Sequence, residues 1–122
     1  MKKDFGFKDL KVWQRALDLA DKVIDTTENL NTDRKHFRLI EQIEGCSASI
    51  AQNIAEGKGR RSNKEFIQFL YIARGSLYET VTLLNLFHRR KWIDTDKLDF
   101  FEEQAFEIAS MIKGLINSFY DK

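Results

Sequence analysis

The sequence predicts an all-α protein, an antiparallel up-down-up-down four-helix bundle built as a single domain over residues 1–122. Three observations predict it. The 122 residues contain no proline, the commonest helix breaker. Apolar residues recur at steps of three and four positions in four separate segments, which is the spacing of one helix face. Short polar connections join the segments, and four amphipathic helices of similar length pack most simply as antiparallel neighbours.

The first two helices are expected at about residues 9–28 and 33–56. The predicted apolar face of the first consists of Val12, Trp13, Ala16, Leu17, Ala20, Val23, Ile24 and Thr27. The stripe of the second consists of Phe37, Ile40, Ile43, Ser47, Ile50 and Ile54. We expect Gly57 to end the second helix, because glycine is favoured just beyond a helix C-cap.

The third helix is expected to begin at Ser62, because S-N-K-E has the pattern of a capping box. The Ser62 hydroxyl would accept from the amide of Glu65, whose carboxylate would reach back to the Ser62 amide. The stripe of this helix is Phe66, Phe69, Leu70, Ala73, Leu77, Val81, Leu84 and Phe87. Asp94 or Thr95 is expected to cap the fourth helix.

The fourth helix carries more apolar residues than one core-facing stripe requires. Its heptad seam is Leu98, Phe101, Ala105, Ile108, Ile112, Leu115 and Phe119. The additional apolar residues are Phe100, Phe106, Met111 and Ile116. A second apolar face of this kind predicts self-association.

The motifs argue against an enzyme. His36 and His88 do not stand in the Glu-x-x-His spacing of a di-iron bundle, and the glycines of EGKGR lack the spacing of a P-loop. The only cysteine, Cys46, is expected to be an inert core thiol in a reducing compartment. We therefore expect no catalytic residue, no metal and no cofactor. No apolar run approaches the roughly 20 residues of a membrane span, and the N-terminal residues do not form a signal peptide, so a cytoplasmic protein is expected.

Charge is balanced overall but unevenly distributed. The chain has 20 cations and 19 anions, yet residues 37–92 carry a net +4 and residues 93–122 a net −4. The first basic cluster consists of Lys58, Arg60, Arg61 and Lys64, and the second consists of Arg89, Arg90 and Lys91 beside His88. The clusters are expected at opposite ends of the third helix, roughly 40 Å apart. Lys2 and Lys3 are expected to join the first cluster.

These clusters are candidate contacts for the phosphate backbone of RNA or DNA, since arginine, lysine and free helix-terminal amides suit phosphate oxygens. The alternative is that they are ordinary solvated helix ends. Trp92 is expected to plug the end of the bundle, the alternative being a platform on which bases stack.

The stretches FKDLKVWQRALDLADKV and SIAQNIAEGKGRRSNKEFIQFLYIARGSLYE give the chain a specific resemblance. They resemble the four-helix-bundle proteins encoded within intervening sequences of bacterial 23S ribosomal RNA genes, a group related to the accessory variability proteins of diversity-generating retroelements. The resemblance implies a homopentamer with a basic surface and, in the retroelement branch, binding to nucleic acid and to a reverse transcriptase. The matching motif residues are Asn53, Glu56, Gly57, Gly59, Arg60, Arg74, Gly75, Ser76 and Glu79.

Glu44 and Gly45 depart from the family pattern, because relatives typically carry a basic pair there. If the second and third helices pair about residue 59 or 60, Gly45 faces the level of Arg74 and Gly75, and the two glycines permit a close helix approach. Glu44 would then pair with Arg74.

At the other end of this hairpin, Asn53 and Glu56 would satisfy amides around Ser62 to Lys64. The motif would then chiefly build the hairpin, with direct ligand contact as the alternative.

Two functions follow from these expectations. The first is a non-enzymatic, oligomeric, nucleic-acid-associated accessory protein in which repeated basic clusters bind phosphate backbone. The second is a protein-interaction scaffold that docks a partner such as a reverse transcriptase.

Overall fold

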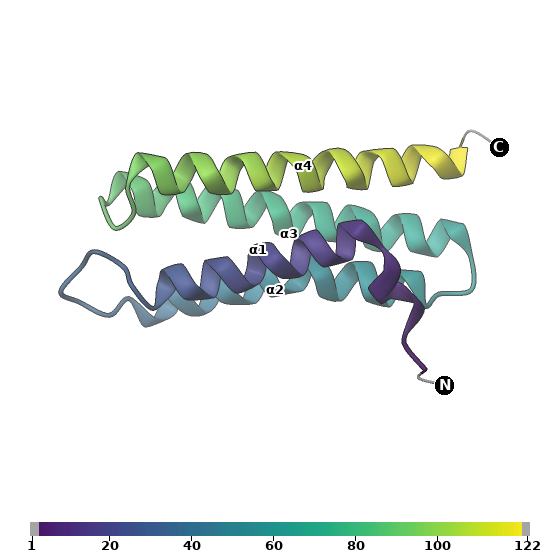
Figure 1. Cartoon of the computed structure of the whole chain (residues 1–122), viewed down its shortest axis with the longest axis horizontal. Coiled ribbons are helices and arrows are strands. Elements are labelled where there is room, and N and C mark those ends of the chain that lie inside the picture. Colours follow the sequence, from purple (N-terminus) through teal and green to yellow (C-terminus); the bar gives the residue numbers. More distant parts are fainter. Residues whose placement is uncertain (1–2, 121–122) are drawn as a thin grey trace.

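A computed structural model describes residues 3–120 and shows a bundle of four helices (Figure 1). The elements are a short 3-10 helix η1 (Gly6–Asp9), then α1 (Lys11–Thr27), α2 (Phe37–Lys58), α3 (Asn63–Arg89) and α4 (Thr95–Tyr120). Successive helices run in opposite directions, and α1 packs on α2, α2 on α3, α3 on α4 and α4 on α1. The predicted up-down-up-down four-helix bundle is therefore confirmed, and the part of the chain described here contains no strand.

One hydrophobic core, drawn from all four helices, runs along the bundle. Its largest fully buried side chains are Phe87, Phe101, Leu19, Ile43, Ile50, Ile54, Leu70, Leu77, Leu84, Ile108, Ile112 and Val23. Burying one such side chain contributes roughly 1.5 to 3 kcal/mol. Most of the apolar positions predicted from the three- and four-residue spacing lie in this core, so the predicted core is largely confirmed.

Two predicted positions of α1 are wrong. Leu17 is 47% exposed and Ile24 is 37% exposed, whereas Leu19, which the predicted face omitted, is 2% exposed. The buried seam steps by four and three residues from Val12 through Leu19 to Thr26. Leu17 and Ile24 lie rotated away from that seam, on the solvent side of the contacts with α2 and α4.

The second apolar face of α4 is smaller than predicted. Ile116 is 3% exposed and belongs to the core, and Met111 packs against the core. Phe100 and Phe106 remain exposed, at 38% and 74%. The ammonium of Lys22 lies 4.8 Å from the centre of the Phe100 ring, which leaves Phe106 as the least covered large apolar side chain of this helix.

The second helix begins later than predicted, at Phe37, because the preceding loop docks on the turn between α3 and α4. The amide of Asn31 donates to the carbonyl of Trp92 at 3.0 Å. The ring of His36 stacks on Trp92 with 3.9 Å between ring centres. Phe37, predicted to be apolar core, is 69% exposed, since it starts the helix beyond the end of the core.

Trp92 closes this end of the bundle. It is 7% exposed and lies between the rings of His36 and Phe87, the latter at 5.1 Å between centres. The amide of Trp92 donates to the carbonyl of Phe87, and the amide of Lys91 donates to the carbonyl of His88, both at 2.9 Å. This pair of bonds is a Schellman motif, and Lys91 adopts the left-handed conformation that the motif requires, with φ of 65°. The expectation of a bundle-end plug is confirmed.

Side chains cap α3 and α4. The Ser62 hydroxyl oxygen accepts from the amide of Glu65 at 3.2 Å, as predicted. The Glu65 carboxylate accepts from the Ser62 hydroxyl, so the reciprocal half of the predicted capping box takes a different form. Asp94 rather than Thr95 caps α4, by accepting from the amide of Lys97 at 2.8 Å.

No helix within residues 3–120 combines the length and the apolar character that spanning a membrane requires.

Lys91→Gly should stabilise the protein, because a residue with a side chain costs about 1 to 2 kcal/mol in the left-handed helical conformation and glycine does not. We expect the free energy of unfolding, measured by urea denaturation, to rise by about 1 kcal/mol. Arg90→Gly is the matched control: Arg90 has a right-handed φ of −77°, so this change should lower stability. Equal effects of the two substitutions would contradict the assignment of the cap.

Candidate nucleic-acid interface

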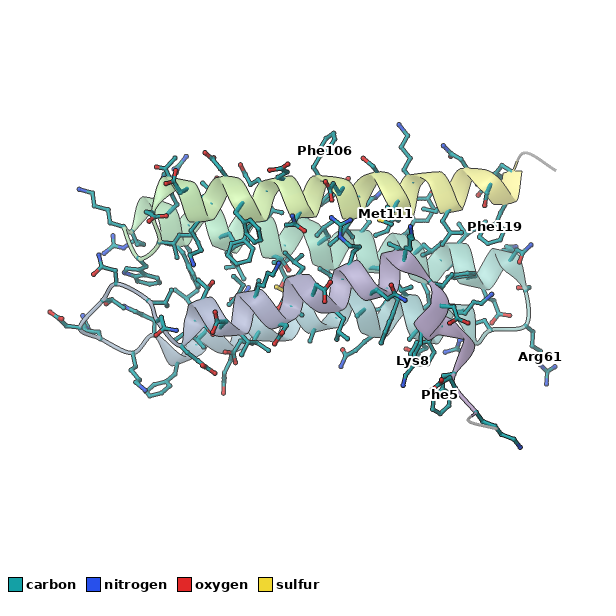
Figure 2. The ribbon with its side chains drawn as sticks, viewed as in Figure 1. Phe5, Lys8, Arg61, Phe106, Met111 and Phe119 are labelled. Atoms are coloured by element: carbon teal, nitrogen blue, oxygen red, sulfur yellow. The ribbon has the colours of Figure 1, made fainter. Side chains whose placement is uncertain are left out.

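The two basic clusters lie at opposite ends of the bundle, as their positions in the sequence predict. The first cluster, Lys58, Arg60, Arg61 and Lys64, lies on and beside the turn between α2 and α3. Figure 2 shows Arg61 at this end together with Phe5 and Lys8, and η1 packs on α2. Lys3 is exposed, while Lys2 lies outside the described residues.

Arg60 differs from the rest of the first cluster. Its guanidinium donates to the Glu56 carboxylate at 2.9 Å and lies over the Phe69 ring at 4.7 Å. Arg60 therefore braces the turn against both helices. The other members, Lys58, Arg61 and Lys64, are exposed, and no carboxylate of residues 3–120 lies within 4.0 Å of their charged groups.

The start of α3 adds backbone donors to this surface. The amides of Asn63 and Lys64 belong to the first turn of the helix, where N–H groups have no intrahelical acceptor. The helix dipole makes this end partly positive. The turn therefore presents cationic side chains and free amides together, which is a chemical match for phosphate oxygens.

The second cluster lies in a mixed electrostatic environment. Arg89 and Arg90 are exposed at the end of α3. Lys91 lines a cavity of about 600 Å³, whose walls also include Asp25 and Asp94. These carboxylates offset part of the positive charge, so the second cluster is the weaker candidate for an anionic ligand.

Sequence reasoning missed three cations that the fold brings to the same end. They are Arg34 and Lys35, in the loop that docks beside Trp92, and Arg38, in the first turn of α2. The signal was the local run D-R-K-H-F-R, which was interpreted as part of a helix. The α1–α2 loop and the α3–α4 turn lie at the same end of the bundle (Figure 1), and the contacts of Asn31 and His36 with Trp92 dock the loop on the turn.

The family-motif residues mostly build the α2–α3 contact. The Asn53 amide donates to the backbone carbonyl and the hydroxyl of Ser49, each at 2.8 Å. The hydroxyls of Ser49 and Ser76 lie 3.0 Å apart and join the two helices. The expectation that Asn53 satisfies amides at the start of α3 is wrong, because its side chain reaches back one turn along its own helix.

Cys46 lies about one helical turn before Ser49 on α2 and continues the polar contact with α3. Its thiol lies 3.3 Å from the hydroxyl of Thr80 and donates to the carbonyl of Ile43 at 3.5 Å. Burial raises the pKa of the Cys46 thiol above its usual value, which opposes thiolate formation. Glu79, another motif residue, is exposed nearby on α3. Cys46 is thus a buried core thiol, as expected.

The glycine of α2 that packs tightly against α3 is Gly57, and neither Gly45 nor Gly75 makes such a contact. A Cβ atom at Gly57 would lie 2.6 Å from the Cβ of Phe69 and 2.9 Å from the ring of Phe66. Gly45 and Gly75 are exposed, and a Cβ at either would meet no atom within 4 Å. Both point outward, so the expected close approach there is wrong. Gly57 also lies inside α2, which ends at the C-cap Gly59.

The expected pair between Glu44 and Arg74 is also absent. The Glu44 carboxylate accepts from the hydroxyl of Thr27 at 2.6 Å, because this side of α2 faces α1. The guanidinium of Arg74 lies over the rings of Tyr71 and Tyr78, at 4.8 and 5.8 Å from their centres. Glu56 likewise pairs with Arg60 instead of capping α3.

Among residues 3–120 there is no group of three or more histidine, cysteine, aspartate or glutamate side chains placed to hold a metal ion.

Comparisons with known proteins agree with this architecture. A family model described as 23S rRNA-intervening sequence protein matches residues 8–114. A crystal structure of a protein of unknown function from the S23 ribosomal protein family of Bacteroides thetaiotaomicron VPI-5482 is similar, with a TM-score of 0.80 and 27% sequence identity. The similarity covers 86% of this chain and 97% of that chain. No curated protein matches the sequence significantly.

Gly57→Ala should destabilise the protein, because the added methyl group overlaps Phe69 at a position that cannot relax by rotating a side chain. We expect a loss of about 1 to 2 kcal/mol in the free energy of unfolding, measured by urea denaturation, since overpacking outweighs the better helix propensity of alanine. The matched control is Gly45→Ala, which meets no atom within 4 Å and should be neutral or stabilising. A stabilised Gly57→Ala variant would refute the close contact.

Proposed function

The chain belongs to the 23S rRNA-intervening sequence protein family, and we propose that it is a non-enzymatic accessory protein that binds the phosphate backbone of RNA or DNA through its bundle-end basic clusters. The first cluster is the principal contact in this proposal. The second cluster contributes less, because Asp25 and Asp94 lie beside Lys91.

One observation carries the proposal: Lys58, Arg61 and Lys64 project from a single turn without an ion-pair partner among the residues that the structure describes. Unpaired cations bind phosphate without first breaking an internal salt bridge. Arg60 keeps the turn in shape through Glu56 and Phe69. Contacts of this type position a nucleic acid but do not read its sequence, so the proposed binding is sequence-tolerant and strongly salt-dependent.

The proposal includes self-association, which the family resemblance implies as a homopentamer. A single copy offers few phosphate contacts at the first cluster. Repeating the cluster on one assembly lets weak contacts act together, because binding of one copy raises the effective concentration of the others near the same strand. The chain's small net charge of +1 is compatible with this arrangement, since the positive charge is local.

A second candidate function is favoured by an apolar groove between α3 and α4. Tyr78, Val81, Phe106 and Ala109 line it, and its volume is about 560 Å³. A protein partner such as a reverse transcriptase could place an apolar side chain there. Pull-down of such a partner that survives nuclease treatment and is lost in Phe106→Asp, which places a charge in the groove, would favour this function over the first.

Neutralising the first cluster should weaken RNA binding and flatten its salt dependence. For Lys58→Gln with Arg61→Gln, titrating a fluorescent single-stranded RNA at several salt concentrations should show a slope of log affinity against log salt reduced by about 1.4 when one copy engages the strand, since each lost contact removes about 0.7. The reduction is larger if several copies engage it.

The matched control is Lys22→Gln with Lys113→Gln, which removes the same charge from helix surfaces away from the turn. This control should retain the parent slope. Equal losses in both variants would show that binding follows net charge alone, and an affinity of the parent protein that does not change with salt would refute backbone binding.

A further inference from the structure

A pocket lies between α3 and α4 at the end of the bundle that carries the first cluster. Its volume is about 470 Å³, and its walls include Lys64, Ile67, Gln68 and Tyr71 of α3 with Phe119 and Tyr120 of α4. Figure 2 shows Phe119 at the same end of the bundle as Arg61. We call this cavity the end pocket. Because Lys64 belongs to both, the end pocket is continuous with the first cluster.

The end pocket presents aromatic and apolar surface that the fold holds in place. Ile67 is buried, and Phe119 packs against the core. Tyr71 on α3 and Tyr120 on α4 also line the pocket, and both are exposed. The guanidinium of Arg74 lies 4.8 Å from the centre of the Tyr71 ring, an attractive contact that restrains the ring. The pocket therefore offers positioned rings to a ligand that arrives from solvent.

The polar groups of the end pocket are neutral or cationic. The side-chain amides of Asn63 and Gln68 line it together with the ammonium of Lys64. Both amides are exposed, and no side-chain hydrogen bond within residues 3–120 uses either of them. No carboxylate of the described chain lines this pocket, whereas Asp25 and Asp94 line the cavity at the other end of the bundle. The end pocket therefore suits a ligand that carries negative charge beside groups that donate and accept hydrogen bonds.

A nucleotide with an unpaired base matches these features. A base is flat and apolar on its two faces, and its edge carries hydrogen-bond donors and acceptors. Tyr71 and Tyr120 supply aromatic rings on which a base stacks. The amides of Asn63 and Gln68 donate and accept at its edge. The phosphate attached to the nucleotide is anionic and matches Lys64 and the rest of the first cluster.

We propose that the end pocket binds an unpaired base of a strand whose phosphates lie on the first cluster, so that the protein prefers single-stranded nucleic acid to duplexes. A base in a duplex enters a pocket only after unstacking and unpairing, both of which cost free energy. A base in a single strand or a loop is already available. Stacking on aromatic rings tolerates every base, so the preference is for the form of the strand and not for its sequence.

Base binding at the end pocket deepens the proposed function, on which it rests for the phosphate contacts. The first cluster alone attracts any phosphate backbone, paired or unpaired. The two kinds of contact respond differently to salt, because phosphate contacts release counterions and stacking on a neutral ring does not. Loss of the stacking contact should therefore lower the affinity without changing its salt dependence, whereas loss of a cation from the first cluster changes both.

Tyr71→Ala tests the stacking contact, with Tyr78→Ala as its matched control. Both tyrosines are exposed on α3 with the Arg74 guanidinium over their rings, but Tyr78 does not line the end pocket. Tyr71→Ala should bind a fluorescent single-stranded RNA about tenfold more weakly than the parent, at an unchanged slope of log affinity against log salt. Tyr78→Ala should bind like the parent, and so should Tyr71→Phe, which keeps the ring. A Tyr71→Ala variant with parent affinity, or one whose weaker binding accompanies a changed mass in light scattering, would overturn the proposal.

A second measurement needs only the parent protein and three probes of equal length. These are a single-stranded RNA, its duplex with the complementary strand, and an abasic strand that has the same phosphates but no bases. The single strand should bind at least about tenfold more tightly than the abasic strand, and also more tightly than the duplex. Equal affinities for all three probes would overturn base binding and leave backbone binding intact. Failure of the parent to bind any of them would instead refute the proposed function, and base binding with it.

Discussion

The contact between α2 and α3 is the constraint on which the candidate interface depends. At Gly57 the absence of a side chain lets the backbone of α2 approach Phe66 and Phe69 more closely than any other residue would allow. Ser49 with Ser76 and Cys46 with Thr80 continue the contact as a polar seam along both helices. The connection between the helices is short, since α2 ends at Lys58 and α3 begins at Asn63, and the packing of the two helices fixes the positions of both its ends.

The defined turn decides which cations face solvent. Arg60 is folded back onto Phe69 and Glu56, so its charge is used within the turn. Its neighbours Lys58 and Arg61 have no such partner in the described chain and point outward. At the opposite end the docked loop and the Trp92 plug bring carboxylates and cations together, which makes that end electrostatically mixed. Most residues of the family motif therefore hold the α2–α3 turn in place, and few of them belong to the exposed basic surface.

Periodicity and caps were enough to predict the fold. Four helices, the core seam of α2 and α3, and the caps at Ser62 and Asp94 all followed from local sequence, because the core stripe and the capping residues are local properties. The rotation of a helix about its own axis, which decides which of two neighbouring apolar residues is buried, is not a local property of the sequence. Whether Leu17 or Leu19 is buried depends on where α2 and α4 lie against α1, and the sequence alone does not contain that information. The direction in which Gly45 and Gly75 point also depends on how α2 and α3 are rotated about their axes, so their positions in the sequence could not show that both face outward.

The central claim, that nucleic-acid backbone binds at the α2–α3 turn, is tested most directly by mapping the contact residue by residue. Backbone amide resonances can be followed by NMR while a short single-stranded RNA is added at low salt. The account predicts that the largest shifts fall in residues 58–64, including the free amides of Asn63 and Lys64, and that they reverse when salt is raised. Shifts confined to the α3–α4 groove, or no shifts at any RNA concentration, would contradict it.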